Sequence, residues 1–313
     1  MSIEESTHMD TKTGAALTVR TAVDFDVPRS ACDCHVHVFD PATFPYDRER
    51  TYTPPPASID DLRRQQASLG FERVVVVAPS VYGTENSCTI DAVRRLGARA
   101  RGVVVIDQSV TTSMLDDMVA AGMCGARLNL ETTQDTDAVA AKRTLHTIAE
   151  RLRDRDWHIQ FDTRLSVIAA LKDEIAALPF PVVFSHFGRA RAALGPSQPG
   201  FDDLLALVKS GRAYVKISAP YRTSERSPDF PDVAPLARAL VAANEERVLW
   251  ASNWPHPGRG PTPTALAPPY PNDDGHVLNL LPNWVPDAAI RKMILVDNPA
   301  RLYGFATPFR NRS

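Results

Sequence analysis

The sequence ACDCHVHVF, residues 31–39, is the first of a series of short apolar runs from which the fold is predicted. These runs are rich in β-branched residues, and helix-length sequence with polar and apolar positions at helical spacing lies between them. After the opening stretch, further strands are predicted at residues 73–80, 101–107, 124–130, 157–162, 181–186, 213–218 and 247–253. Eight strands that alternate with helices predict an α/β fold, a (β/α)8 TIM-like barrel of parallel strands with helices outside.

Two segments stand apart from this alternation. Residues 1–24 are polar and lack periodicity, so we expect a flexible N-terminal arm, and residues 25–313 are expected to form one barrel domain. The proline-rich stretch at about 255–286 follows the last predicted strand. A loop of this length after a strand end is expected to lie over the barrel mouth.

The composition limits the classes of partner. The 313 residues include 35 Lys and Arg against 37 Asp and Glu, so no global charge favours nucleic acid or an anionic membrane. No apolar run approaches the roughly 18 residues of a membrane helix, and the N-terminus lacks a secretory apolar core. The four cysteines lack metal or disulfide spacing. A cytoplasmic protein is expected, and a homo-oligomer is compatible with the sequence.

Chemically active side chains concentrate at the ends of the predicted strands. In a (β/α)8 barrel the C-terminal strand ends face one shared mouth, where substrates bind. The side chains on the last residues of these strands or just beyond them are His35, His37, Ser80, Tyr82, Arg127, Asn129, Asp162, His186, Ser218, Arg222, Asn253 and His256. This placement favours an active site at the mouth.

The pair His35 and His37 is the most informative local signal. Residues two apart on a strand point to the same side, so both imidazoles suit a joint grip on a metal ion or a substrate oxygen. A single His-x-His pair is also compatible with structural histidines. Together with His186 on a separate strand end, the pair predicts a triad of histidine side chains that converge at the mouth.

Seven motifs in order extend this interpretation: CDCHVHVFDP, APSVYGTENS, GARLNL, SHFGR, KISAPYRTS, WASNWPHP and DNPARLYGF. With them, nearly the whole chain after residue 30 resembles the amidohydrolase superfamily, in its amidohydrolase 2 branch. The group most similar to it is that of the 2-pyrone-4,6-dicarboxylate lactonases, with the related sulfomuconolactone and sugar-acid lactonases. The resemblance implies an amidohydrolase-type barrel that opens a small anionic lactone with water.

The resemblance also implies roles for individual residues. His35, His37 and His186 match the histidines that polarise the lactone carbonyl. Substrate contacts are implied for Arg127, Arg222, Tyr52 and Ser80, and Tyr82, Asn129, Arg189 and His256 are further candidates near the strand ends. The pyrone dicarboxylate enzymes have a second arginine six residues after the position of Arg127, where this chain has Thr133. That departure favours a lactone with differently placed acid groups.

Two interpretations of metal use follow. The pyrone lactonases that the chain resembles work without metal, so no cofactor is expected. The alternative is one Zn²⁺ bound by His35, His37 and His186, since three protein ligands are typical of catalytic zinc. A second metal is disfavoured, because Arg127 and Asn129 offer no bridging carboxylate or lysine on the fourth strand.

Asn253 is the departure with the largest chemical consequence, because it stands where the resemblance implies the aspartate that activates water. An amide accepts no proton from water, whereas a positioned general base contributes about 10²–10⁴ in rate. Three interpretations are open: an inactivating Asp-to-Asn change, a variant in which His256 or His186 serves as base, and a catalytically impaired metabolite-binding protein. A zinc-dependent decarboxylase or amidohydrolase of the same superfamily is the enzymatic alternative.

Overall fold

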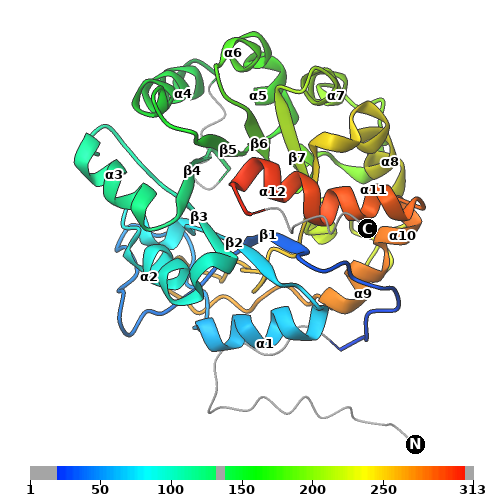
Figure 1. Cartoon of the computed structure of the whole chain (residues 1–313), viewed down its shortest axis with the longest axis horizontal. Helices are drawn as coiled ribbons and strands as arrows, with labels where there is room; N and C mark the ends of the chain where they lie inside the picture. The colour runs from blue at the N-terminus through cyan, green and yellow to red at the C-terminus, as the bar shows by residue number, and fades with distance from the viewer. Residues whose placement is uncertain (1–19, 132–137, 307–313) are drawn as a thin grey trace, which may run out of the picture.

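The computed structural model describes residues 20–131 and 138–306. Within these ranges, eight parallel strands follow one another around the sheet in chain order (Figure 1). They are β1 (Cys32–Val36), β2 (Arg73–Val77), β3 (Ala100–Val104), β4 (Met123–Asn129), β5 (His158–Asp162), β6 (Val182–Phe184), β7 (Ala213–Ser218) and β8 (Val248–Ala251). Each strand overlaps its predicted range, so the predicted (β/α)8 barrel is confirmed.

The ring closes between the first and last strands. The backbone N–H of Asn253 donates to the carbonyl of His35 at 2.9 Å, and the N–H of His37 donates to the carbonyl of Trp254 at 2.8 Å. These bonds continue the ladder just beyond the regular part of β8. They also hold the His35–His37 pair beside Asn253.

Helices surround the ring on its outside (Figure 1). Those between successive strands are α1 (Ile59–Leu69), α2 (Ser87–Leu96), α3 (Thr112–Ala120), α4 (Ala138–Leu152), α5 (Leu165–Ala170), α6 (Lys172–Ala177), α7 (Phe201–Lys209) and α8 (Ala234–Ala243). After β8 come α9 (Asp274–Asn279), α10 (Leu281–Trp284), α11 (Ala288–Lys292) and α12 (Asn298–Tyr303). Among the described helices, none combines the length and apolar character of a membrane span.

Helix α1 shows how local sequence sets an element. Ser58 accepts the backbone N–H of Asp61, and the Asp61 carboxylate accepts the backbone N–H of Ser58 in return. This reciprocal capping stabilises a helix start by about 1 kcal/mol. The helix ends at Gly70, whose φ of 76° is left-handed and suits glycine.

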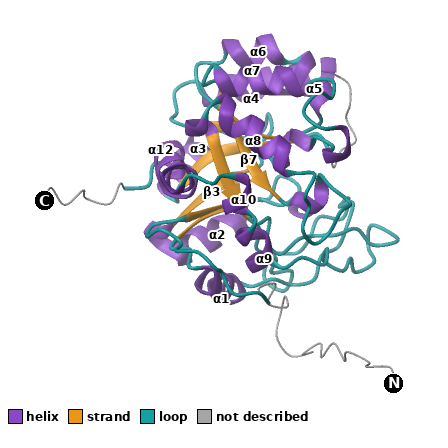
Figure 2. Ribbon diagram, turned by 90° about the vertical axis from the view of Figure 1, so that its right-hand side faces the viewer, coloured by secondary structure: helices purple, strands orange, loops and turns teal. Residues whose placement is uncertain are grey.

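The two ends of the barrel differ. Tyr303 of α12 and the following Phe305 pack against Cys32, Cys34 and Tyr214 and fill the end where the strands begin. Figure 2 shows α12 at this end and the long loops at the other. The open mouth therefore lies at the C-terminal ends of the strands, as the fold requires.

The first described residues are attached to the domain. The backbone N–H groups of Arg20 and Thr21 donate to the Asp273 carboxylate at about 3.1 Å. The side chain of Asn279 in α9 accepts from Asp24 at 3.0 Å and donates to the Ala22 carbonyl at 2.8 Å. The end of the expected N-terminal arm thus binds the segment that follows β8, while residues 1–19 lie outside the described ranges.

Candidate active site

A cavity of about 190 Å³ opens at the barrel mouth. Seven of the residues proposed from the sequence line it, namely His37, Tyr52, Ser80, Arg127, His186, Arg189 and Arg222. The other lining residues are Glu131, Asp162, Pro257, Gly258, Arg259 and Tyr270. The wall of the cavity is therefore strongly polar and rich in arginine.

The three predicted histidines converge at this end of the barrel. The ring centroids of His35 and His37 are 4.9 Å apart, and those of His35 and His186 are 5.0 Å apart. All three rings are buried. Burial is the main reason why the pKa of each lies below its ordinary value, at about 3 for His37. At neutral pH the imidazoles are therefore uncharged hydrogen-bonding groups.

Hydrogen bonds locate the proton on two of these imidazoles. His37 Nδ1 lies 2.7 Å from the Val77 carbonyl, which only accepts, so Nδ1 carries the proton and Nε2 the lone pair. Lys216 Nζ donates to Gln160 Oε1 at 2.5 Å, which turns the Gln160 amide nitrogen toward His35 Nδ1 at 3.5 Å. The proton of His35 therefore lies on Nε2. That atom is buried and has no hydrogen-bond partner among the described residues, and His35 lies beside the lining residues His37 and His186 without lining the cavity itself.

Lys216 is fully buried inside the barrel on β7. Besides Gln160, its Nζ donates to the Cys34 carbonyl at 2.7 Å. Burial lowers the pKa of Lys216 to about 7. Charged or neutral, the amine has hydrogens for both acceptors, so it fixes the orientation of Gln160 in either state.

This proton arrangement does not fit the zinc alternative. Zinc binds the lone pair of an imidazole nitrogen, whereas the nitrogen of His35 that Gln160 leaves free carries a proton. Nearby positive charge on Lys216 and Arg127 also lowers the pKa of His35. Across residues 20–131 and 138–306, no three His, Cys, Asp or Glu side chains are grouped as ligands for a metal. The three histidines converge, and the hydrogen bonds of His35 do not leave it a lone pair for a metal.

Two arginines of the cavity share one buried carboxylate. Arg189 donates to Asp162 from Nε at 2.7 Å and from Nη2 at 3.0 Å, and Arg127 donates from Nη2 at 3.1 Å. Burial by itself raises the pKa of Asp162, but its charged neighbours, Arg189 foremost, outweigh burial and hold the pKa well below the ordinary value. Arg127 also donates to the Ala78 carbonyl at 2.9 Å. Asp162 therefore orients both guanidinium groups.

The cavity retains an excess of positive charge after this pairing. Its charged lining residues are Arg127, Arg189, Arg222, Arg259, Asp162 and Glu131. Glu131 already binds Arg164 at 2.8 Å. Four guanidinium groups against two carboxylates favour a ligand with at least one carboxylate or sulfonate group. Thr133, where the pyrone dicarboxylate enzymes have a further arginine, lies outside the described residues.

The proline-rich segment forms one wall of the cavity. Its contributions are Pro257, Gly258, Arg259 and Tyr270. Arg222 Nη2 donates to the Pro257 carbonyl at 3.2 Å, and the Arg222 guanidinium carbon lies 5.5 Å from the centroid of the Tyr270 ring. The segment therefore helps to position a candidate anion-binding residue.

The remaining proposed binding residues divide into two groups. Tyr52 and Ser80 both lie in the cavity wall. Tyr82 is not among the lining residues, and its hydroxyl accepts the backbone N–H of Asp40 at 2.9 Å. Asn129 ends β4 and also lies outside the lining. Tyr52 and Ser80 are thus the better placed candidates for substrate contact.

Asn253 follows β8 with a φ of 68°, a left-handed conformation that Asn and Asp adopt more readily than most residues. The preceding Ser252 is anchored by Asp33, which accepts its backbone N–H at 3.0 Å and its hydroxyl at 2.6 Å. Asn253 Nδ2 donates to Tyr221 Oη at 2.8 Å, and His256 Nδ1 lies 3.1 Å from the same oxygen. The position expected for a base therefore contacts a tyrosine and, through it, a histidine.

Several residues of this arrangement are absent from the candidates drawn from the sequence. They are Gln160, Lys216, Tyr221 and Asp274. Strand alternation contains a signal for two of them, because Lys216 lies two residues before Ser218 and Gln160 two residues before Asp162, on the same inward side. Asp274 belongs to the segment after β8 and has no comparable signal.

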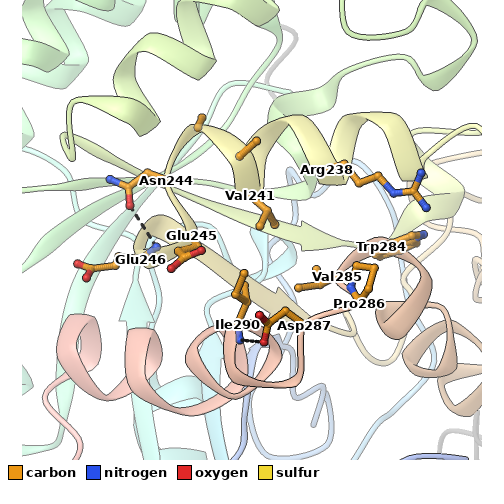
Figure 3. Close-up of a pocket in the computed structure, with 12 residues that line it drawn as sticks. Arg238, Val241, Asn244, Glu245, Glu246, Trp284, Val285, Pro286, Asp287 and Ile290 are labelled. Carbon is orange, nitrogen blue, oxygen red and sulfur yellow. Dashed lines mark hydrogen bonds between the residues drawn. The ribbon is translucent and has the colours of Figure 1, made fainter.

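A second hollow, of about 580 Å³, lies away from the mouth, between α8 and the segment from α10 to α11 (Figure 3). Its lining includes Arg238, Val241, Trp284 and Ile290. None of the candidate site residues lines it. The smaller cavity at the mouth is therefore the candidate active site.

Comparisons with known proteins agree with this geometry. A family model described as amidohydrolase matches residues 32–305. The chain is 36% identical over 287 residues to a 4-sulfomuconolactone hydrolase of Rhizobium radiobacter, a match that covers 90% of this chain and 92% of that protein. It is 34% identical over 289 residues to a 2-pyrone-4,6-dicarboxylate hydrolase of Comamonas testosteroni, with 89% and 92% covered.

A third relative is named for a different reaction. The chain is 31% identical over 291 residues to a D-galactarolactone isomerase of Agrobacterium fabrum, a match that covers 90% of this chain and 94% of that protein. The family model, the barrel and these three relatives all confirm the resemblance found in the sequence motifs. The chain belongs to the amidohydrolase family.

Proposed function

We propose that this protein hydrolyses a small anionic lactone by attack of water on a histidine-polarised carbonyl. The observation that carries the proposal is a neutral imidazole N–H donor, His35 Nε2, at the end of a barrel whose mouth holds four arginines. The donor suits a carbonyl oxygen, and the arginines suit an acid group on the same molecule. Two relatives are named hydrolases of such compounds, a sulfomuconolactone and a pyrone dicarboxylate.

In the proposed reaction, His35 donates its Nε2–H to the carbonyl oxygen, and His186 lies beside it as a second polarising group. Arg127 and Arg222 orient the acid group. Water adds to the carbonyl carbon, the ring C–O bond breaks, and the product is an open-chain acid with one new carboxylate. His37 has a lone pair on Nε2, so we assign it a hydrogen bond from the attacking water, in place of the carbonyl contact that the resemblance implies.

The size and charge of the cavity restrict the substrate class. About 190 Å³ lies below the roughly 300–1,000 Å³ of pockets for drug-sized ligands. We therefore propose a single-ring lactone with one or two acid groups, of the muconolactone, sulfomuconolactone or pyrone dicarboxylate type. A panel of these lactones, with neutral lactones of equal size as controls, tests this. Hydrolysis adds the mass of one water to the product, and no ring opening of any acidic member would refute the proposal.

Asn253 favours a second candidate, isomerisation of one lactone ring size to another. In that reaction a hydroxyl of the substrate replaces the ring oxygen, so no water needs to be activated, and one relative is named a lactone isomerase. Reaction in ¹⁸O-labelled water separates the candidates. Hydrolysis incorporates the label into the product, whereas isomerisation yields an unlabelled lactone of unchanged mass.

Removal of metal ions is expected to leave the hydrolysis rate unchanged, because the proton on His35 Nε2 opposes a zinc ion at the three histidines. The measurement is kcat before and after dialysis against a chelator, together with the metal content of the protein. Activity that is lost on dialysis and restored by zinc would instead favour the zinc-dependent decarboxylase or amidohydrolase alternative.

Replacement of Arg222 by Gln is expected to raise KM for an acidic lactone by about 10-fold or more, because a charge-assisted hydrogen bond is lost. The effect on kcat is expected to be smaller. Arg238→Gln is the matched control, since Arg238 lines the hollow away from the mouth. An unchanged KM in Arg222→Gln would remove Arg222 from the substrate site.

A further inference from the structure

A continuous chain of side-chain contacts begins at Asn253. Asn253 Nδ2 donates to Tyr221 Oη at 2.8 Å, Tyr221 Oη lies 3.1 Å from His256 Nδ1, and His256 Nε2 lies 3.0 Å from Asp274 Oδ2. The members come from the segment after β8, from the turn after β7 and from the first residue of α9. The fold therefore assembles a tyrosine, a histidine and an aspartate beside the position that lacks a base.

The chain lies next to the cavity, since none of its four members is among the lining residues but Tyr221 contacts one of them. The Tyr221 ring stacks on Tyr270 at a centroid distance of 5.0 Å, and Tyr270 lines the cavity. The next residue, Arg222, also lines it. Tyr221 thus lies directly behind two residues of the cavity wall, at the same end of the barrel as the histidines.

The far end of the chain is a buried carboxylate surrounded by donors. His256 and Asp274 are both fully buried. Asp274 also accepts from the side-chain amides of Gln65 and of Asn272, the latter at 2.7 Å. Amide donors therefore contact both carboxylate oxygens of Asp274, and His256 contacts one of them.

The hydrogen bonds also define the direction in which a proton can move along the chain of contacts. Because the carboxylate of Asp274 accepts, His256 carries its proton on Nε2 and its lone pair on Nδ1. The lone pair accepts the O–H of Tyr221, whose oxygen in turn accepts the amide N–H of Asn253. Every donor faces an acceptor, and a proton that reaches Tyr221 Oη has a path to His256.

We propose that Tyr221, His256 and Asp274 form a proton relay that acts in place of a carboxylate at position 253. This proposal rests on the lactone hydrolysis proposed above. As the oxygen of water bonds to the carbonyl carbon, its proton passes to Tyr221 Oη while the proton of Tyr221 passes to His256 Nδ1. Asp274 stabilises the resulting imidazolium. When the ring C–O bond breaks, the proton returns by the same path to the leaving oxygen.

The test compares Tyr221→Phe, His256→Gln and Asp274→Asn in the native chain and in an Asn253→Asp chain. In the native chain each is expected to lower kcat for a lactone by about 100-fold, the scale of general-base catalysis, with little change in KM. In the Asn253→Asp chain each is expected to lower kcat by less than about 10-fold, because the carboxylate then takes the proton directly. The solvent deuterium isotope effect on kcat should also fall in Tyr221→Phe.

Two control variants lie outside the relay. His276→Gln removes an imidazole from a partly exposed His–Asp pair, since His276 Nε2 lies 2.9 Å from Asp229. Tyr303→Phe removes a hydroxyl at the closed end of the barrel that has no hydrogen-bond partner in the described part of the chain. Both should retain native kcat. If Asp274→Asn fails to fold, Tyr221→Phe decides the matter, because it keeps the ring that stacks on Tyr270.

Each outcome has one meaning. Equal losses of kcat in both backgrounds, or no loss in native Tyr221→Phe, would overturn the relay and leave lactone hydrolysis standing. A native chain without activity beside an active Asn253→Asp chain would do the same. If neither chain opens any lactone of the panel, the proposed function itself is overturned, and the relay with it.

Discussion

Replacement of Asn253 by Asp is expected to raise kcat for lactone hydrolysis by about 100-fold or more. A carboxylate takes the proton of water in a single transfer. The route through Tyr221 moves two protons, and burial raises the pKa of this phenol, so it gives up its proton reluctantly. The fold should be unaffected, because Asp tolerates the left-handed φ of 68° at this position as Asn does.

The gain in kcat is measured on the lactone that the native protein opens fastest, or on the whole panel if the native rate is too low. Asn253→Ala is the matched control, because it removes the amide without adding a base and should show no gain. Thermal unfolding of both variants separates chemistry from folding. An Asn253→Asp chain no faster than the native chain on every lactone would show that residue 253 does not contact the attacking water.

Replacement of Asp162 by Asn is expected to destabilise the protein by about 3–5 kcal/mol, the usual cost of removing one partner from a buried ion pair. The side chain is 5% exposed and binds two arginines, so its loss leaves both positive charges uncompensated. KM should rise as well, because Arg127 and Arg189 lose the group that orients them. Chemical denaturation and steady-state kinetics measure the two effects. Asp91→Asn, in an exposed pair with Arg95, is the control and should change little.

The effect of Asp162→Asn on the free energy of unfolding is also expected to depend on pH. The folded pKa of Asp162 is held well below its unfolded value of about 3.9, so its stabilising contribution is fully present above that value. The contribution is lost as the pH falls toward the folded pKa. The difference in unfolding free energy between native protein and Asp162→Asn should therefore be constant from pH 7 to pH 5 and shrink below about pH 4. A constant difference down to pH 3 would contradict the ion-pair explanation.

The sequence predicts the barrel well because each strand is a compact apolar run between helices of ordinary length. The continuous apolar run RVVVV at residues 73–77 is typical of a parallel strand that is buried on both faces. Strand alternation also predicts that His35 and His37 face one side, and their rings do lie 4.9 Å apart. Local sequence patterns that favour one structure strongly are thus sufficient to predict that structure.

The proton positions in the site are not recoverable in this way. Which nitrogen of His35 carries a proton depends on Gln160, whose orientation depends on Lys216, two strands further along the barrel. The partners of Asn253 depend on how the turn after β7 meets the segment after β8. Such contacts join residues far apart in sequence through single hydrogen bonds. The periodicity of the sequence does not predict them.

The closed end of the barrel, filled by Tyr303 and Phe305, has a consequence for turnover. Because that end is closed, the substrate enters and the product leaves at the mouth, past the arginines. Ring opening creates a second or third negative charge, so the departing acid is gripped more tightly than the arriving lactone. We therefore expect the open-chain product to inhibit the reaction competitively, and simple dianions such as sulfate to compete with the lactone for the mouth.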